Sequence, residues 1–141
     1  METNAVGFTR MVGTGYRYMA GHGGGHIAVI SSIAGTKGLG PAPAYSATKA
    51  MQNTYIEALE QLANAQQLNI RFTDIRPGFV DTDLLNDGRR YPLQLDKVKV
   101  AKEIADSIDK NRHIRVIDWR WRIITFAWRL IPRFLWRHFK L

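Results

Sequence analysis

The sequence predicts an α/β fold in which helices cover both faces of a doubly wound parallel sheet. Short apolar runs that suit buried parallel strands alternate with longer segments of helical periodicity, in the order helix, strand, helix, strand, helix, strand. The 141 residues, 45% hydrophobic and 23% charged, suffice for one modest core. This composition excludes a fibrous or disordered chain.

The first half of the chain contains two helical segments around one strand. Residues 1–20 have helical periodicity, and the glycine-rich segment 21–25 ends the helix. Residues 27–30 form an unbroken apolar run, typical of a strand buried on both faces. After a loop over 35–43 rich in glycine and proline, a helix is predicted over 44–68. We expect its buried side to carry Ala50, Met51, Thr54, Ala58, Leu59 and Leu62.

The second half repeats the alternation. A second strand is predicted over 69–76, followed by a polar loop over 81–96. A short helix over 97–110 and a third strand over 113–117 complete the pattern. Right-handed crossovers between such strands make the sheet parallel, and the carboxyl ends of its strands then border the ligand crevice.

Several classes of site and segment are excluded or disfavoured. The absence of cysteine excludes a disulfide scaffold, a cysteine nucleophile and a thiolate metal site. The four histidines share no metal-ligand spacing, and we expect no metal site. The N-terminus lacks the pattern of a signal peptide, and no apolar run approaches the roughly 20 residues that span a bilayer. We therefore expect a cytoplasmic protein.

Tyr45 and Lys49 stand four residues apart at the start of the second predicted helix, so that both side chains project from nearly the same face. A lysine ammonium near a phenol favours the phenolate and lowers the pKa of the tyrosine from its ordinary value of about 10. Such a tyrosine can exchange a proton with a carbonyl or an alcohol. Ser32 follows the first strand, where its hydroxyl can hold the substrate oxygen. The spacing of Tyr45 and Lys49 alone also fits the alternative, in which the two residues are an ordinary pair on the protein surface.

Four segments around these residues resemble, in order and separation, motifs of the short-chain dehydrogenase/reductase family. They are Asn4-Ala5-Val6-Gly7, Ile30-Ser31-Ser32-Ile33-Ala34-Gly35, Tyr45-Ser46-Ala47-Thr48-Lys49 and Arg76-Pro77-Gly78-Phe79-Val80-Asp81-Thr82. The resemblance implies that residues 1–118 are the C-terminal, catalytic half of a family domain, with part of a Rossmann-type sheet. It also implies NAD(P)-dependent interconversion of carbonyls and alcohols by hydride transfer.

The resemblance implies a role for each matching residue. Tyr45 would be the general acid/base, Lys49 would lower its pKa and bind the nicotinamide ribose, and Ser32 would polarise the substrate carbonyl. Asn4 would support a water-linked proton relay that reaches Lys49. The implied cofactor-binding set is Tyr45, Lys49, Pro77, Gly78, Val80 and Thr82, with the last two near the carboxamide. Ser31 is less suited than Ser32, because strand alternation turns its side chain to the opposite face.

The glycine-rich turn with which the family meets the cofactor pyrophosphate has no counterpart before Asn4. Gly38 and Gly40 do not replace it, because Pro41 and Pro43 stand where a helix would have to begin. We therefore expect no appreciable NAD(P)H binding by the isolated chain and a first strand that lacks a neighbour on one edge. The implied cofactor remains NAD(P)(H), with NADP favoured over NAD, and the implied substrate is a small, hydrophobic carbonyl or alcohol. The alternative function is that of a non-catalytic remnant acting through a membrane or a partner.

The tail over 119–141 differs from the rest of the chain. It holds all four tryptophans and six arginine and lysine residues, but no acidic residue. As a helix kinked near Pro132, it presents aromatic surface rimmed by cations, typical of helices at a membrane interface. Packing on the body or on a second subunit is the alternative, since the full-length family is oligomeric. Nucleic-acid binding is disfavoured, because no nucleic-acid motif is present. Peripheral contact with the inner face of a membrane is the leading expectation.

Overall fold

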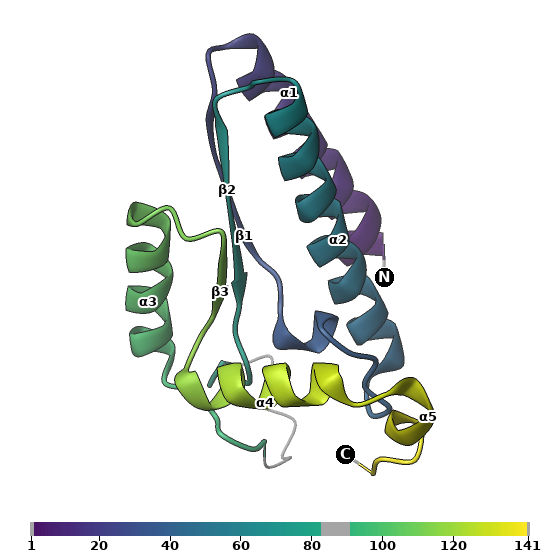
Figure 1. Cartoon of the computed structure of the whole chain (residues 1–141). Coiled ribbons are helices and arrows are strands. Elements are labelled where there is room, and N and C mark those ends of the chain that lie inside the picture. The colour runs from purple at the N-terminus through teal and green to yellow at the C-terminus, as the bar shows by residue number, and fades with distance from the viewer. Residues whose placement is uncertain (1, 83–90, 141) are drawn as a thin grey trace.

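The computed structural model, which describes residues 2–82 and 91–140, confirms the α/β class and the parallel sheet (Figure 1). Its described strands pair in the order β1-β2-β3, both pairs parallel. The strands are β1 Gly25–Ile30, β2 Ile70–Arg76 and β3 Ile114–Val116. The helices are α1 Phe8–Gly21, α2 Pro43–Ala65, α3 Lys97–Asp109, α4 Trp119–Leu130 and α5 Arg133–Trp136. Of the predicted polar loop, residues 83–90 lie outside the described residues.

The helices cover the sheet from three directions. Helices α1 and α2 lie side by side on one face, and α3 lies on the other (Figure 1). Helix α4 crosses the carboxyl ends of the strands, and α5 lies beside the start of α2 (Figure 1). Within the described sheet β1 is an edge strand, because it pairs with β2 alone. The segments that follow β1 and β2 therefore lie close to one another at the carboxyl edge of the sheet, next to α4.

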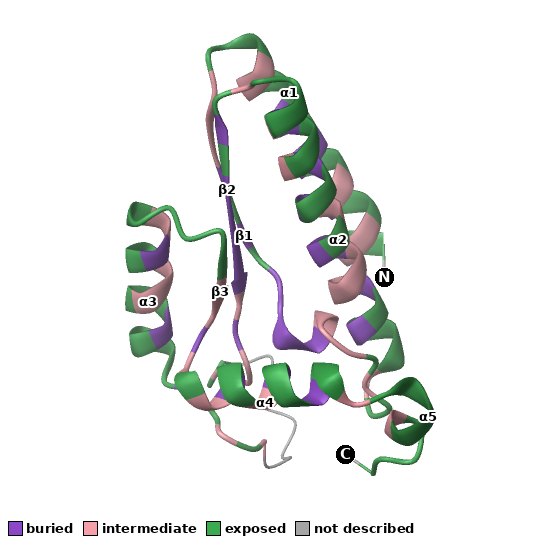
Figure 2. Cartoon of the chain, in the orientation of Figure 1, coloured by how far each residue is buried: buried purple, intermediate pink, exposed green. Residues whose placement is uncertain are grey.

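Two hydrophobic clusters, one on each face of the sheet, hold these layers together. The first joins α1 and α2 to the sheet and includes Phe8, Val12, Tyr16, Ile56 and Phe72. The second joins α3 and α4 to the other face and includes Ile75, Val100, Ile117, Trp121 and Trp128. Buried residues accordingly lie on the strands and on the inward sides of the helices (Figure 2). The prediction that residues 27–30 form a strand buried on both faces was wrong: Ile27 and Val29 are buried beneath α1 and α2, but Ala28 and Ile30 on the other face are exposed, because the second cluster contains no residue of the edge strand β1.

The buried side of α2 differs from the prediction. Thr54, Ala58 and Leu62 are exposed, so their assignment to the buried side was wrong. The buried residues of α2 are Ser46, Thr48, Gln52, Asn53, Ile56, Leu59 and Ala63. Apolar periodicity cannot identify this side, because a polar side chain is buried at low cost when partners elsewhere in the fold satisfy it. Gln52 has two such partners.

Candidate active site

Ser32 stands at the carboxyl edge of the sheet, two residues after β1 ends. Its backbone is extended, and its hydroxyl oxygen accepts a hydrogen bond from the Ala34 N–H at 3.1 Å, which caps the short 3-10 turn Ile33–Gly35. A serine hydroxyl that accepts in one bond keeps its proton for another. Among the described residues nothing accepts that proton. Ser32 can therefore donate to a substrate oxygen.

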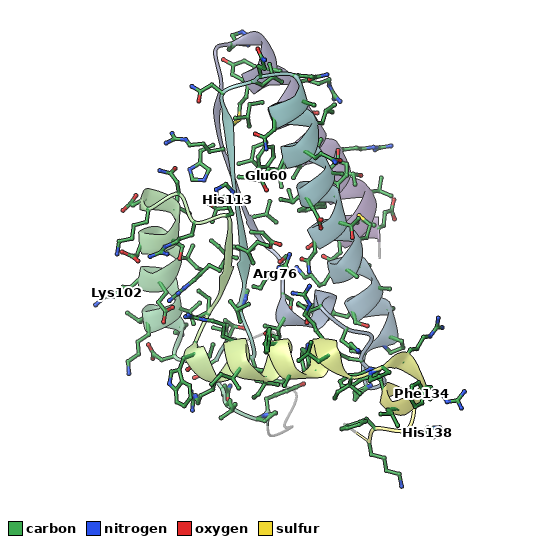
Figure 3. All side chains as sticks on the ribbon, viewed as in Figure 1. Glu60, Arg76, Lys102, His113, Phe134 and His138 are labelled. Atoms are coloured by element: carbon green, nitrogen blue, oxygen red, sulfur yellow. The ribbon has the colours of Figure 1, made fainter. Side chains whose placement is uncertain are left out.

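Ser31 is oriented differently from its neighbour. Its hydroxyl donates to the carboxylate of Asp74 and, at 3.3 Å, to the Ile75 carbonyl. The other carboxylate oxygen of Asp74 forms an ion pair of 2.6 Å with Arg76, whose side chain lies at the carboxyl end of β2 (Figure 3). The two charged side chains are only 3% and 12% exposed. Ser31 thus belongs to a buried polar cluster of Ser31, Asp74 and Arg76.

Tyr45 and Lys49 lie in the first turns of α2, whose first residue is Pro43. A proline suits this position, because the first N–H groups of a helix have no intrahelical acceptor. The Lys49 ammonium nitrogen lies 5.8 Å from the centroid of the Tyr45 ring. The Tyr45 residue is 40% exposed, and its hydroxyl has no hydrogen-bond partner among the described residues. The phenol is therefore free to meet a substrate.

The Lys49 ammonium is anchored at the end of β1. It donates to the Ile30 carbonyl at 3.4 Å, which lies just before the two serines. Burial lowers the pKa of Lys49, and the Asp74 carboxylate partly opposes this by raising it. Gly35 lets the 3-10 turn that follows Ser32 pack directly on α2, because a Cβ at this position would lie 2.6 Å from the Lys49 carbonyl. The structure thus places Lys49 beside Tyr45 and against the segment that carries Ser32.

Asn4 is linked to Lys49 through a residue that the sequence analysis missed. The Lys49 ammonium donates to the Gln52 amide oxygen at 3.1 Å, and the Gln52 amide nitrogen donates to the Asn4 backbone carbonyl at 2.8 Å. Gln52 lies three residues after Lys49, on the same side of α2. The sequence offered one signal for Gln52, which is a polar residue about one helical turn after Lys49.

The predicted cofactor-binding residues of the fourth motif lie in the loop after β2. The carbonyl of Pro77, the first residue of this loop, accepts a hydrogen bond from the Ile33 N–H at 3.1 Å. This bond connects the loop to the 3-10 turn that follows Ser32. Gly78 is required where it stands, because a Cβ would come within 2.3 Å of the Trp121 indole nitrogen. Val80 forms a bridge to Leu95 that uses the Phe79 carbonyl and the Asp81 N–H.

The bridge turns the N–H and the carbonyl of Val80 itself away from Leu95. The Thr82 hydroxyl donates to that carbonyl at 3.4 Å, so Thr82 lies on the same outward side. Backbone groups that point out of a loop at the carboxyl edge fit a nicotinamide carboxamide, which needs one donor and one acceptor. The residues that the resemblance assigns to the nicotinamide end of a cofactor are thus compatible with it.

The C-terminal segment holds the loop that connects Ser32 to Tyr45. The Trp128 indole donates to the Thr36 hydroxyl at 2.9 Å, and the Trp136 indole donates to the Gly38 carbonyl at 2.7 Å. In the opposite direction, the Lys37 ammonium donates to the Ile131 carbonyl at 2.6 Å. Helices α4 and α5 therefore support the candidate site directly. Across residues 2–82 and 91–140, no group of three acidic or histidine side chains is arranged to hold a metal ion.

Comparisons with known proteins show the family of the chain. The family model described as short chain dehydrogenase matches residues 1–91. An uncharacterized oxidoreductase of Mycobacterium tuberculosis is 29% identical over 136 residues, which are 94% of this chain and 53% of that protein. Dehydrogenase/reductase SDR family member 7B of Danio rerio is 30% identical over 124 residues, covering 79% of this chain and 40% of that protein.

Among solved structures, a short chain dehydrogenase from Burkholderia cenocepacia, crystallised in complex with NADP, superposes with a TM-score of 0.71 at 18% identity. The match covers 93% of this chain and 57% of that one, and it shows a shared fold. The chain spans about half the length of the first relatives it matches. By its family match and its fold, the chain belongs to the short-chain dehydrogenase family of oxidoreductases.

Proposed function

We propose that this chain carries the catalytic centre of an NAD(P)-dependent oxidoreductase that interconverts carbonyls and alcohols. The observation that supports this most is the Lys49 ammonium beside the ring of Tyr45, whose hydroxyl is free among the described residues. The ammonium places a positive charge beside the ring that carries the negative charge once Tyr45 has given its proton to a substrate.

The proton and the substrate oxygen are handled by three side chains. Tyr45 donates its proton to the carbonyl oxygen during reduction and takes it back when an alcohol is oxidised. Lys49 stabilises the phenolate that remains, and the Ser32 hydroxyl donates a hydrogen bond to the same substrate oxygen. When bound, NAD(P)H supplies the hydride that reduces the carbonyl carbon. Proton and hydride together convert the carbonyl into the alcohol.

The cofactor would be held at its nicotinamide end by Lys49, by the outward backbone groups of Val80 and by Thr82. We favour NADP over NAD, and the NADP in the Burkholderia cenocepacia structure supports this choice. The residues that we assign to the cofactor contact its nicotinamide end, and the chain spans about half of the length of its first relatives. A truncated donor that needs only the nicotinamide end is therefore the better probe.

The test uses reduced nicotinamide mononucleotide and a panel of aldehydes and ketones of increasing hydrophobicity. We expect consumption of the dihydronicotinamide, followed by its fluorescence, that depends on both the chain and the carbonyl. Binding energy from the missing parts of the cofactor is lost, so the concentration needed will be high. Rates equal to those in buffer for every carbonyl would count against the proposal.

A second proposal concerns the surface of the C-terminal helices. Helix α4 has two apolar sides: Trp121 and Trp128 are buried against the body, whereas the opposite side is exposed. That exposed stripe consists of Trp119, Ile123, Phe126 and Leu130, each 59–68% exposed. On α5 the side chain of Phe134 also points away from the body (Figure 3). We propose that this stripe rests on an anionic membrane surface, since the arginines around it have no acidic neighbour after position 118.

None of the helices in the described ranges is long and apolar enough to cross a membrane, so the proposed contact is peripheral. We expect the chain to co-sediment with phosphatidylglycerol vesicles at low salt. Phe126→Ser removes one inserted side chain and should weaken binding about tenfold. Val98→Ser, which alters an exposed apolar residue on α3, is the matched control and should leave binding unchanged. If the wild-type chain stays in the supernatant, or forms dimers that cover the stripe, the membrane proposal fails.

A further inference from the structure

Gln52 is a buried polar side chain in the middle of a helix that was predicted to bury apolar residues. It is 3% exposed. A carboxamide removed from water without hydrogen-bond partners costs the fold several kcal/mol. Gln52 avoids this cost through the Lys49 ammonium on one side and the Asn4 carbonyl on the other.

These two partners determine which way the amide points. A lysine ammonium can only donate hydrogen bonds, and a backbone carbonyl can only accept them. The arrangement with the amide oxygen toward Lys49, at 3.1 Å, and the amide nitrogen toward Asn4, at 2.8 Å, satisfies both. The flipped amide would place donor against donor and acceptor against acceptor. Gln52 is therefore matched chemically to the two groups that it joins.

The Asn4 carbonyl lies in an unusual first turn of the chain. The first turn, Thr3–Gly7, is π-helical, and the N–H of Phe8 reaches back to the Thr3 and Ala5 carbonyls. Within this turn, the Asn4 carbonyl accepts from the Gln52 amide nitrogen. Such wide turns often mark functional positions in helices. Here the turn connects the start of the chain with α2.

The bridge restricts the ammonium of Lys49. Of its three N–H groups, one is directed to Gln52 and one to the Ile30 carbonyl. Two fixed N–H directions stop rotation about the terminal bond and set the direction of the third. The charged and titratable groups around Lys49 are Asp74 on β2, which raises its pKa, and Tyr45 on its own helix. The first turn, Thr3–Gly7, contributes the uncharged Asn4, whose carbonyl binds Gln52.

We propose that Gln52 is a positioning residue that bridges Lys49 to the backbone of Asn4 and thereby holds the ammonium against Tyr45. The inference rests on the proposed function, in which Lys49 acts on Tyr45. An amide N–H is not acidic enough to pass a proton on as water does. Gln52 therefore holds Lys49 without conducting its proton, and proton exchange with solvent takes place on the exposed side of Tyr45.

The test is the titration of Lys49 in the chain labelled with 13C at the lysine Cε atoms, followed by NMR. The Lys49 signal is identified by its loss in Lys49→Met. Gln52→Met keeps the length of the side chain but removes the amide, so that one hydrogen bond to the half-buried ammonium is lost. Since a hydrogen bond to a charged group contributes about 1.5–3 kcal/mol, we expect the pKa of Lys49 to fall by about one to two units.

Two further variants complete the test. Gln52→Glu keeps the shape but adds a carboxylate beside the ammonium, so the pKa of Lys49 should rise. Gln61→Met, which alters an exposed glutamine on the same helix, is the control and should leave it unchanged. If Gln52→Met does not fold, Gln52→Glu alone decides, and an unchanged pKa in that variant overturns the bridge. An unchanged pKa in a folded Gln52→Met overturns it as well.

The titration requires neither cofactor nor turnover, so it separates the two proposals. A shifted Lys49 pKa together with full activity of Tyr45→Phe would support the bridge and refute the catalytic assignment. An inactive Tyr45→Phe together with an unshifted Lys49 pKa would do the reverse. In the assay with reduced nicotinamide mononucleotide, Gln52→Met should lower kcat about tenfold and change the KM for the carbonyl little, because Gln52 does not touch the substrate.

Discussion

Replacing Tyr45 by phenylalanine should slow carbonyl reduction by about 100-fold to 10,000-fold, the usual contribution of a positioned general acid. The substitution removes the hydroxyl but keeps the ring beside Lys49. Substrate binding and fold should therefore survive, and the loss should fall on kcat. The measurement is the rate of dihydronicotinamide consumption with the best carbonyl of the panel, at saturating donor.

The matched control is Tyr18→Phe, which removes the hydroxyl of an exposed tyrosine on α1. Its rate should equal that of the wild-type chain. A near-normal rate in Tyr45→Phe would remove Tyr45 from the reaction. The same loss in both variants would show that the effect is not specific to the site.

Replacing Asp74 by alanine should lower the free energy of unfolding by about 3–5 kcal/mol. The reason is the buried polar cluster, in which Asp74 pairs with Arg76 and accepts the Ser31 hydroxyl. Without the carboxylate, a guanidinium whose side chain is 12% exposed has lost its partner, and a buried hydroxyl has lost an acceptor. The measurement is urea unfolding followed by circular dichroism.

The control for this prediction is Asp106→Ala. Asp106 pairs with Lys110 on the surface of α3, where both side chains are 57% exposed. Such a pair contributes less than about 1 kcal/mol. A double variant, Asp74→Leu with Arg76→Met, removes both buried charges and should recover much of the loss. Equal destabilisation by Asp74→Ala and Asp106→Ala would show that the buried cluster has no special role in stability.

Those parts of the fold that depend on local pattern were predictable from the sequence. The apolar run over 27–30 lies within β1, and the strand predicted over 69–76 corresponds to β2. The break of the tail near Pro132 is also confirmed: α4 ends at Leu130, and α5 begins at Arg133. Helix α2 ends at Ala65, earlier than predicted, and Gln67 then adopts a left-handed φ of 55°.

What depends on distant partners was not predictable. The spacing of Tyr45 and Lys49 indicates by itself that they share a face of a helix. Nothing near Gln52 in the sequence indicates that its partner is Asn4, 48 residues away. Likewise, composition marks the tail as aromatic and basic, but only packing shows that Trp128 faces the body and Phe126 the solvent.

The central claim is hydride transfer at the carboxyl edge of the sheet, with Tyr45 as the acid. The most direct measurement uses reduced nicotinamide mononucleotide deuterated at C4 and determines by mass spectrometry where the label goes. We expect the wild-type chain to form alcohol that carries deuterium on the carbinol carbon. In the same time, Tyr45→Phe should form almost none of this labelled alcohol. Unlabelled alcohol, or equal labelling with both chains, would contradict the claim.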